Sequence, residues 1–286
     1  MTSTPLPPVV FENVAADDIS EAMLVEAANL FSNSYGVWGP NAEKNIGPFA
    51  KQGRRVRMSP ARLRQQSLPA NANNFHTRAT CGGELAGYVF ATRWNYAGRE
   101  ICWITQLCID PKYRRHRLAT GLLLKLREGK DDGGFGILSS HPAAVLAALR
   151  AFGRGIEEVD LKMAREHARA IMDCSPVGYV KEAVLRGSLF KTHGEDNVVC
   201  CAYTNFWVDH TEPLEVLQAV KARGIDWPFG DLPDGCEFLV MVKGGQVNQE
   251  GERIRKQLLS SESESRHQNV AVLSKVEGDP NDDFKG

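Results

Sequence analysis

The sequence predicts an α/β (α+β) fold in which helices flank a mixed sheet of about six or seven strands. Three strand-like segments succeed one another between residues 74 and 110, separated by short glycine turns. A strand, a basic turn and an amphipathic helix then occupy residues 103–126, and a second strand and helix occupy 135–152. Because strands joined through a helix usually pair in parallel, we expect an antiparallel meander that leads into a parallel pair.

Composition places the chain among ordinary soluble globular proteins. The 286 residues are 43% hydrophobic and 24% charged, and the formal net charge is −1, so no global basic field favours nucleic acid. Seven cysteines lack zinc-site spacing, which favours free thiols in a reducing compartment. No apolar run approaches membrane-spanning length, and the proline-rich start does not resemble a secretory signal. We therefore expect a cytoplasmic location, or a nuclear one, and no membrane partner.

The N-terminal part predicts two helices around a long irregular segment. Residues 1–10 are expected to be a flexible lead, and Asp18 and Glu21 have the spacing of a capping box at the start of a helix. Residues 32–58 contain several glycines, aromatic side chains and a basic cluster. Ser59 and Pro60 then predict a short helix that extends to Ser67.

The meander is predicted by its turns. Gly82-Gly83 is a two-residue hairpin signal between strands at 74–81 and 84–94. Residues 95–98 form the next turn, and a third strand covers 100–110.

The basic turn after this third strand predicts an anion site. Asp110-Pro111 ends the strand, because proline has no N–H group for the ladder. The next helix has an apolar stripe at Ala119, Leu122, Leu123 and Leu126. Between them lies the run 114–117, and a helix N-terminus next to guanidinium groups suits a pyrophosphate.

These residues resemble motif A of the GNAT (GCN5-related N-acetyltransferase) superfamily, Arg/Gln-x-x-Gly-x-Gly/Ala after an apolar-x-apolar strand end. Here Arg114-x-x-Arg117-x-Ala119 follows Leu107-Cys108-Ile109. In the family, the first glycine of the motif lets the backbone approach the pyrophosphate closely. Here Arg117 replaces that glycine. The alternative interpretation is a solvated basic turn between two core elements.

The resemblance implies the GNAT fold and acetyl-CoA, or another acyl-CoA, as the cofactor, with no metal. In this family the two parallel strands splay apart and the pantetheine arm lies between them. Leu107, Cys108 and Ile109 would then bond the pantetheine amides. The pyrophosphate would be held by Arg114, Arg115, His116, Arg117, Leu118, Ala119 and Thr120.

Residues 11–244 are expected to form this acyltransferase domain, with an insertion at about 153–195. Strong strand character at 198–208 and 237–243, with a helix from Glu212 to about Arg223, predicts an antiparallel pair that closes the sheet. Residues 245–286 are polar and are expected to be a disordered tail.

The catalytic groups common in the family are not found by counting along the chain. The resemblance implies a glutamate base four residues before Leu107 and a tyrosine proton donor seven residues after His141, but these positions hold Trp103 and Ala148. His141 and Ser140 are therefore the candidate catalytic residues, near the thioester. The acceptor site is expected to be lined by Tyr35, Trp38, Trp103 and Tyr203.

Two less favoured chemical roles involve Cys108 and two carboxylates. Cys108 could carry an acyl group, although a covalent route is unusual for the family. Asp231 and Glu237 could act as a base, although carboxylates in such positions are more often simply at the surface.

We expect an N-acetyltransferase that moves acetyl from the CoA thioester to a primary amine by direct transfer in a ternary complex. The acceptor would be a small molecule or a peptide, and the protein a monomer or homodimer. The alternative is a non-catalytic acyl-CoA sensor, which the replaced glycine and the missing glutamate and tyrosine favour. Nucleic-acid binding through residues 54–57 and 114–117 is a weak third hypothesis, because no aromatic residues alternate with these clusters.

Overall fold

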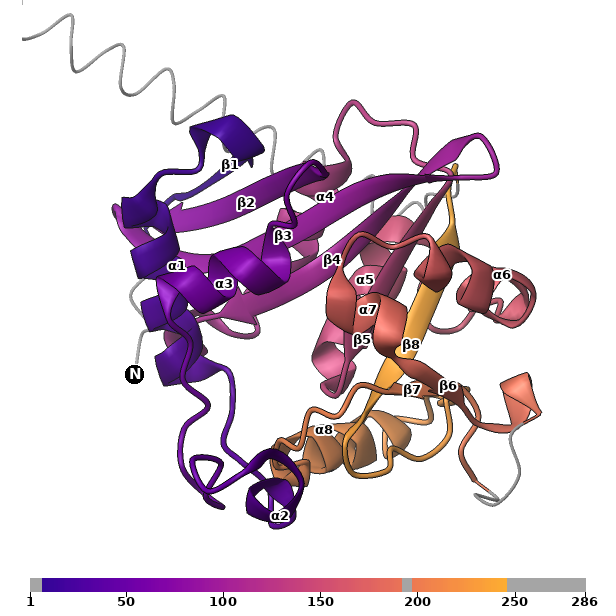
Figure 1. Cartoon of the computed structure of the whole chain (residues 1–286). Coiled ribbons are helices and arrows are strands. Elements are labelled where there is room, and N and C mark those ends of the chain that lie inside the picture. The colour runs from indigo at the N-terminus through magenta and orange to yellow at the C-terminus, as the bar shows by residue number, and fades with distance from the viewer. Residues whose placement is uncertain (1–6, 192–196, 246–286) are drawn as a thin grey trace, which may run out of the picture.

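A computed structural model describes residues 7–191 and 197–245, and it contains one eight-stranded sheet in the order β1-β2-β3-β4-β5-β8-β7-β6 (Figure 1). The strands are β1 (Val9–Ala15), β2 (Asn73–Cys81), β3 (Glu84–Tyr96), β4 (Arg99–Ile109), β5 (Gly134–Ser139), β6 (Val184–Arg186), β7 (Cys201–Tyr203) and β8 (Cys236–Lys243). The helices are α1 (Glu21–Ser34), α2 (Ala42–Ile46), α3 (Pro60–Ser67), α4 (Leu118–Arg127), α5 (Pro142–Phe152), α6 (Lys162–Asp173), α7 (Gly178–Glu182) and α8 (Thr211–Lys221). The predicted fold class is confirmed: the sheet is mostly antiparallel, with a single parallel pair among the described strands.

The antiparallel meander forms as the turn residues predict. Cys81 pairs with Glu84, and both Gly82 and Gly83 have positive φ (60° and 86°), as the tight hairpin requires. Ser59 caps α3 by accepting a hydrogen bond from the Arg62 amide, which confirms the predicted start.

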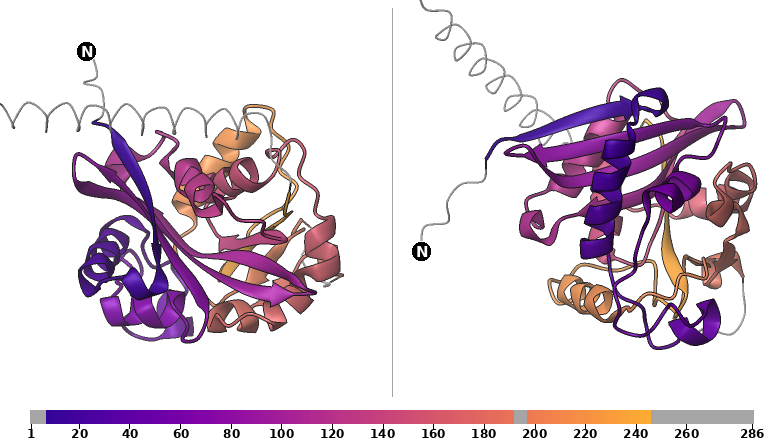
Figure 2. Two further views of the ribbon diagram at one scale, coloured as in Figure 1. Left: turned by 90° about the horizontal axis from the view of Figure 1, so that it is seen from above. Right: turned by 60° about the vertical axis from the view of Figure 1, so that its left-hand side comes forward.

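The sheet has one helical layer on each face (Figure 2). On one face α1 and α3 pack against Tyr88, Phe90 and Cys108 of the sheet. On the other face α4 and α5 cover part of a larger core, in which Phe135 of β5 stacks on Phe152 with ring centroids 4.0 Å apart. The sheet therefore lies between two helical layers, and the parallel pair lies at its centre.

The parallel pair of β4 and β5 is formed over part of its length only. Pairing runs from Ile101↔Gly134 to Ile104↔Ile137 and ends there, although both strands continue. At the same place the pairing of β4 with β3 shifts, because Gln106 faces Phe90 while Ile104 faces Ala91. Thr105 is thus an extra residue in β4, a β-bulge that bends the strand where β5 leaves it.

The C-terminal strands close the sheet, but the predicted strand at 198–208 is largely wrong. Only β7 forms within it, and it pairs with β8 as expected. Asn205 has φ +58°, a left-handed conformation that interrupts a strand. The chain then turns toward the N-terminal segment, where Trp38 and Val208 form an isolated bridge.

Three further features correct the sequence interpretation. Val9 and Val10, assigned to the flexible lead, begin β1, and with β6 this strand raises the predicted six or seven strands to eight. Ser20, not Asp18, caps α1 by accepting from the Met23 amide. The expected insertion at 153–195 contains α6, α7 and β6 in its described part. The expected lead at 1–6 and tail beyond 245 lie outside the described residues.

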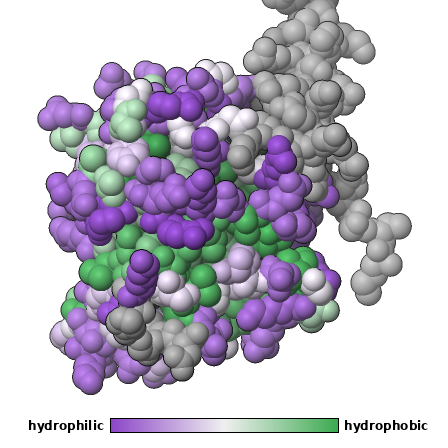
Figure 3. Space-filling view, turned by 90° about the vertical axis from the view of Figure 1, so that its right-hand side faces the viewer, coloured by the Kyte–Doolittle hydropathy of each residue, from purple (hydrophilic) through white to green (hydrophobic). Residues whose placement is uncertain are grey.

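Among the described residues, no helix is long and apolar enough to cross a membrane. The side of the molecule that carries α6 and β6 shows a hydrophobic band between polar areas (Figure 3), and Val184 of β6 is exposed.

Candidate functional site

The site begins at the opening between β4 and β5. Beyond Ile104, the edge of β4 that faces β5 has no β5 partner in the described register, while the opposite edge stays paired with β3 to Ile109. The Tyr179 hydroxyl of α7 donates to the Thr105 carbonyl at 2.9 Å. The predicted residues Leu107 and Ile109 therefore lie on a strand edge with backbone groups available to an elongated ligand.

The basic turn lies at the outer end of this opening. Asp110 accepts a hydrogen bond from the Lys112 amide at 2.8 Å, and buried Tyr113 anchors the turn. Arg115, His116 and Arg117 are exposed. The first amides of α4 follow directly, and a helix start offers N–H groups and a positive dipole end. Exposed cations and free helix amides together suit a phosphate group.

Arg117 adopts the conformation that its position in the turn requires. It is the N-cap of α4 with φ +61° and ψ 14°, a left-handed geometry that glycine adopts easily. Arg115 is also left-handed, with φ +67°. The turn therefore keeps a glycine-like backbone at a cost of about 1 kcal/mol per non-glycine residue, and gains a cation at position 117.

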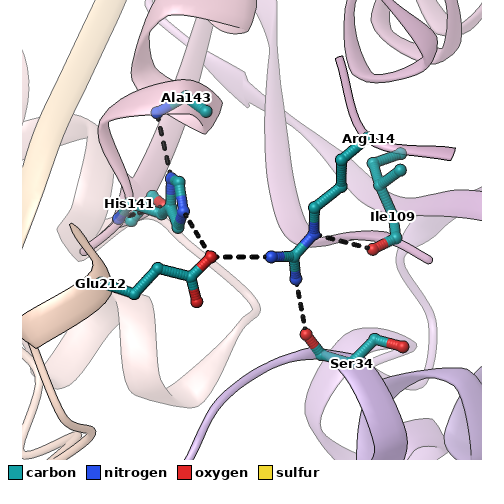
Figure 4. Close-up of polar contacts among 7 residues, drawn as sticks. Ser34, Ile109, Arg114, His141, Ala143 and Glu212 are labelled. Atoms are coloured by element: carbon teal, nitrogen blue, oxygen red, sulfur yellow. Dashed lines mark hydrogen bonds and ion pairs between the residues drawn. The ribbon is translucent and has the colours of Figure 1, made fainter. Parts of the chain in front are cut away.

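Arg114 points away from the exposed turn, into the mouth of the opening (Figure 4). Its guanidinium donates to Glu212 Oε1 of α8 at 2.8 Å and to the Ser34 carbonyl at the end of α1 at 2.7 Å. A longer contact of 3.5 Å reaches the Ile109 carbonyl. The first arginine of the motif thus joins β4, α1 and α8, rather than standing beside Arg115 and Arg117.

His141 lies across the mouth from Arg114, as the N-cap of α5. Its Nδ1 accepts a hydrogen bond from the Ala143 amide at 3.1 Å, and its Nε2 faces Glu212 Oε1 at 3.9 Å. Burial lowers the His141 pKa, the Glu212 carboxylate opposes this, and Arg114 adds to it. Neutral His141 with its proton on Nε2 fits these contacts. Ser140, beside it, is buried.

The sequence interpretation undervalued Glu237, which lies just beyond the end of β5. This β8 residue is buried, and burial raises its pKa to about 7, partly opposed by the Thr204 hydroxyl. Its charge also raises the pKa of Tyr35, at the end of α1, and of Tyr179. Burial is the largest cause of both tyrosine shifts. The signal available in the sequence was a single acidic residue next to an otherwise apolar strand.

Two predicted acceptor-site residues are part of the core. Trp103 is fully buried, and its ring packs over Gly136, where a Cβ atom would lie 2.2 Å from it. Trp38 is buried in a separate cluster with Phe31 and Val208. Their large apolar surfaces are used in packing, and their assignment to the acceptor site stays a prediction.

The remaining predicted residues differ in burial and in their contacts. Tyr203 is half-buried, and its hydroxyl donates to Asn205 at 2.9 Å. Cys108 is buried against α1 and α3, and burial raises its pKa to about 12, so its thiol stays protonated at neutral pH. Asp231 is exposed. In the described ranges, no cluster of three or more His, Cys, Asp or Glu side chains could hold a metal ion.

Comparison with solved structures finds acetyltransferases at low overall similarity. An aminoglycoside acetyltransferase from an uncultured soil metagenomic sample is 20% identical, with 42% of this chain and 70% of that chain covered and a TM-score of 0.29. The ribosomal-protein-S18-alanine N-acetyltransferase of Escherichia coli is 15% identical, covering 48% and 74%, with a TM-score of 0.32. A GNAT family N-acetyltransferase of Escherichia coli in complex with CoA is 20% identical, covering 52% and 76%, with a TM-score of 0.31.

No curated protein matches the sequence. Residues 48–159, which contain the meander, the opened parallel pair and the basic turn, match the acetyltransferase (GNAT) family model. This segment is therefore similar to the GNAT family of acetyltransferases.

Proposed function

We propose that the protein is an acetyl-CoA-dependent N-acetyltransferase that transfers acetyl directly to a primary amine, with both substrates bound together. The observation that carries the proposal is the parting of β4 from β5 after Ile104, with the exposed basic turn at its outer end. An elongated ligand with a diphosphate at one end fits this combination of a free strand edge and a cationic helix start. We assign residues 11–244 to the acyltransferase domain.

In this proposal the opening holds acetyl-CoA along β4. Backbone groups of Leu107, Cys108 and Ile109 face the pantetheine amides. Arg115, Arg117 and the amides from Leu118 to Thr120 hold the diphosphate. Arg114 helps to shape the mouth through Glu212 and Ser34, which assigns it a positioning role.

The acceptor amine enters from the face that carries α1 and α7, where Tyr35 lies. His141 could exchange a proton through Nε2 only, because its Nδ1 caps α5. Ser140 lies next to it as a candidate hydrogen-bond donor. The protonated, buried Cys108 thiol favours direct transfer over an acyl-cysteine route.

The test is release of CoA thiol from acetyl-CoA across a panel of primary amines that includes alkylamines, polyamines and peptides with lysine or a free N-terminus. We expect turnover with at least one class of amine, above the rate of hydrolysis without amine. Acetyl-CoA binding without turnover on any amine would contradict the enzyme and support the alternative acyl-CoA sensor. The occupied Arg114 side chain and the replaced glycine at Arg117 are the observations that favour that alternative.

A further inference from the structure

Glu237 lies at the open end of the parallel pair, on the face of the sheet where the acceptor would enter. Ser139, the last residue of β5, pairs with Phe238, so Glu237 lies just beyond the end of β5. Met241 pairs with Gly136, and a Cβ atom on Gly136 would point at the Trp103 ring, so Met241 and Trp103 lie on the same face of the sheet. Side chains alternate along a strand, so Glu237 points to that face as well. Tyr179 of α7 bonds to Thr105 on β4 at this opening.

This carboxylate is buried without a cation to neutralise it. Its relative exposure is 5%, and no ion pair joins it to any residue within the described ranges. The groups that interact with its charge are hydroxyls: Tyr35 from α1 and Tyr179 from α7, with Thr204 beside it after β7. A buried carboxylate that lacks a cation is costly to the fold, which indicates a use for its charge.

One buried hydroxyl at the same opening has no hydrogen-bond partner. The Oγ1 atom of Thr105 is buried and forms no hydrogen bond with the described residues. Thr105 is the bulge residue at the point where β4 and β5 part, and its carbonyl is held by Tyr179. Buried polar atoms without partners are uncommon in folded proteins, so the Thr105 hydroxyl at this place is consistent with a polar ligand group nearby.

An amine acceptor supplies the cation that Glu237 lacks among the described residues. At neutral pH an alkylamine is an ammonium ion, a cation with three N–H donors. It must lose one proton before its nitrogen can attack the thioester. A buried carboxylate that titrates close to neutral pH can both attract the ammonium and accept that proton.

We propose that Glu237 is the catalytic base that binds the acceptor ammonium and removes its proton, a role that rests on the proposed N-acetyltransferase function. One N–H proton moves to the Glu237 carboxylate, and the nitrogen lone pair then forms the C–N bond at the thioester carbonyl. The C–S bond breaks, and the thiolate takes the second proton from the nitrogen. The products are the amide and CoA thiol, and Glu237 returns its proton to water.

The test compares the wild type with Glu237→Gln, which keeps the shape of the side chain and removes the base. With an amine that the wild type acetylates, we expect kcat/KM to fall at least about 100-fold, the range of general-base catalysis. Acetyl-CoA affinity, measured by calorimetry, should stay within about twofold. Glu215→Gln on the exposed side of α8 is the matched control and should behave as the wild type.

A second measurement separates a base from a merely structural residue. The fluorinated derivative of the same amine, whose ammonium loses its proton below neutral pH, should recover most of the lost rate in Glu237→Gln. The acidic limb near pH 7 in the wild-type kcat/KM profile should disappear in the variant.

Equal rates and unchanged pH profiles in the wild type and Glu237→Gln would overturn this role alone and leave the enzyme standing. Absence of wild-type turnover with every amine would overturn the proposed function, and this role with it.

Discussion

A buried carboxylate lies near each end of the β4–β5 pair, and only one of the two is neutralised by a cation. The closed end is the paired end at Gly134, and the open end is the one where the strands have parted, beyond Ile137. At the closed end Asp132, just before β5, accepts hydrogen bonds from Arg93 Nε at 2.7 Å and Nη2 at 3.1 Å. Arg93 also donates to the Leu126 carbonyl. At the open end Glu237 has no ion-pair partner in the described part of the chain.

The difference indicates that the Asp132 charge stabilises the fold, whereas the Glu237 charge is available for a functional role. A bidentate arginine neutralises Asp132 and fixes the loop before β5. Burial of Glu237 instead raises its pKa to about 7, so that this carboxyl group can exchange protons under physiological conditions. The four predictions that follow test this contrast, from the largest expected effect to the smallest.

The largest effect is expected at the closed end. Asp132→Asn leaves Arg93 buried with an uncompensated charge and should lower the free energy of unfolding by about 3 to 5 kcal/mol. Chemical denaturation measures it. Asp131→Asn is the control, because the Asp131 side chain is 93% exposed and its 3.4 Å contact with Arg99 is weak. Equal stabilities of the two variants would contradict the structural role of the Arg93–Asp132 pair.

At the open end, removing the charge should raise the free energy of unfolding instead of lowering it. Glu237→Gln should be more stable than the wild type above pH 7, because the variant does not bury a charge. The folded pKa of about 7, against an ordinary 4.5, corresponds to about 3 kcal/mol. The raised pKa stabilises the wild type below pH 4.5, and this contribution is lost as the pH rises through 7. The difference between the two proteins should therefore grow from pH 4.5 to 7 and then level.

Unfolding free energies of both proteins at a series of pH values measure this difference. Burial lowers the pKa of His76 to about 3, which also makes stability depend on pH, but both proteins contain His76 and its contribution cancels. A difference independent of pH would mean that Glu237 titrates normally in the folded protein.

The left-handed backbone at Arg117 should give a smaller effect. Arg117→Gly removes the strain and Arg117→Ala retains it, so the glycine variant should be more stable than the alanine variant by about 1 kcal/mol. Both variants lose the same cation, so their acetyl-CoA affinities should fall together. If alanine were as stable as glycine, the turn would not be strained in solution.

The smallest effect is expected at the rim of the opening. The Arg114 and Glu212 side chains are 34% and 59% exposed, so Glu212→Gln should cost about 1 kcal/mol of stability or less. Because the Glu212 carboxylate raises the His141 pKa, this substitution should move that pKa further below its ordinary value. NMR titration of the His141 ring measures the change, and an unchanged pKa would contradict the contact between these residues.

Local signals predicted the central part of the fold well. Gly82-Gly83 predicted one hairpin and Ser59-Pro60 predicted the start of α3, because each of these features depends on neighbouring residues only. The strand predicted at 198–208 did not form beyond β7, because its apolar residues are used by contacts with the distant 37–38 segment. Propensity alone cannot distinguish a strand from an extended segment of this kind.

In the site, as in the fold, only the parts that are contiguous in sequence could be predicted. The turn and the strand edge of β4 are contiguous in sequence, and the motif locates both. The partners of Arg114 and Glu237 are not contiguous: Glu212 is 98 residues from Arg114, and Tyr35 and Tyr179 come from other elements. A pKa set by burial and distant groups requires the folded structure.

The central claim is that the turn at 113–120 holds the diphosphate of an acyl-CoA whose arm lies along the open edge of β4. Calorimetric titration of CoA into Arg115→Glu/Arg117→Glu tests it most directly, with Arg62→Glu/Arg223→Glu, two exposed arginines outside the turn, as the control for the same change in net charge. We predict that the double variant, folded by circular dichroism, binds CoA at least about 100-fold more weakly than the wild type, while the control stays within a few-fold. Unchanged CoA affinity in the folded double variant would contradict the account.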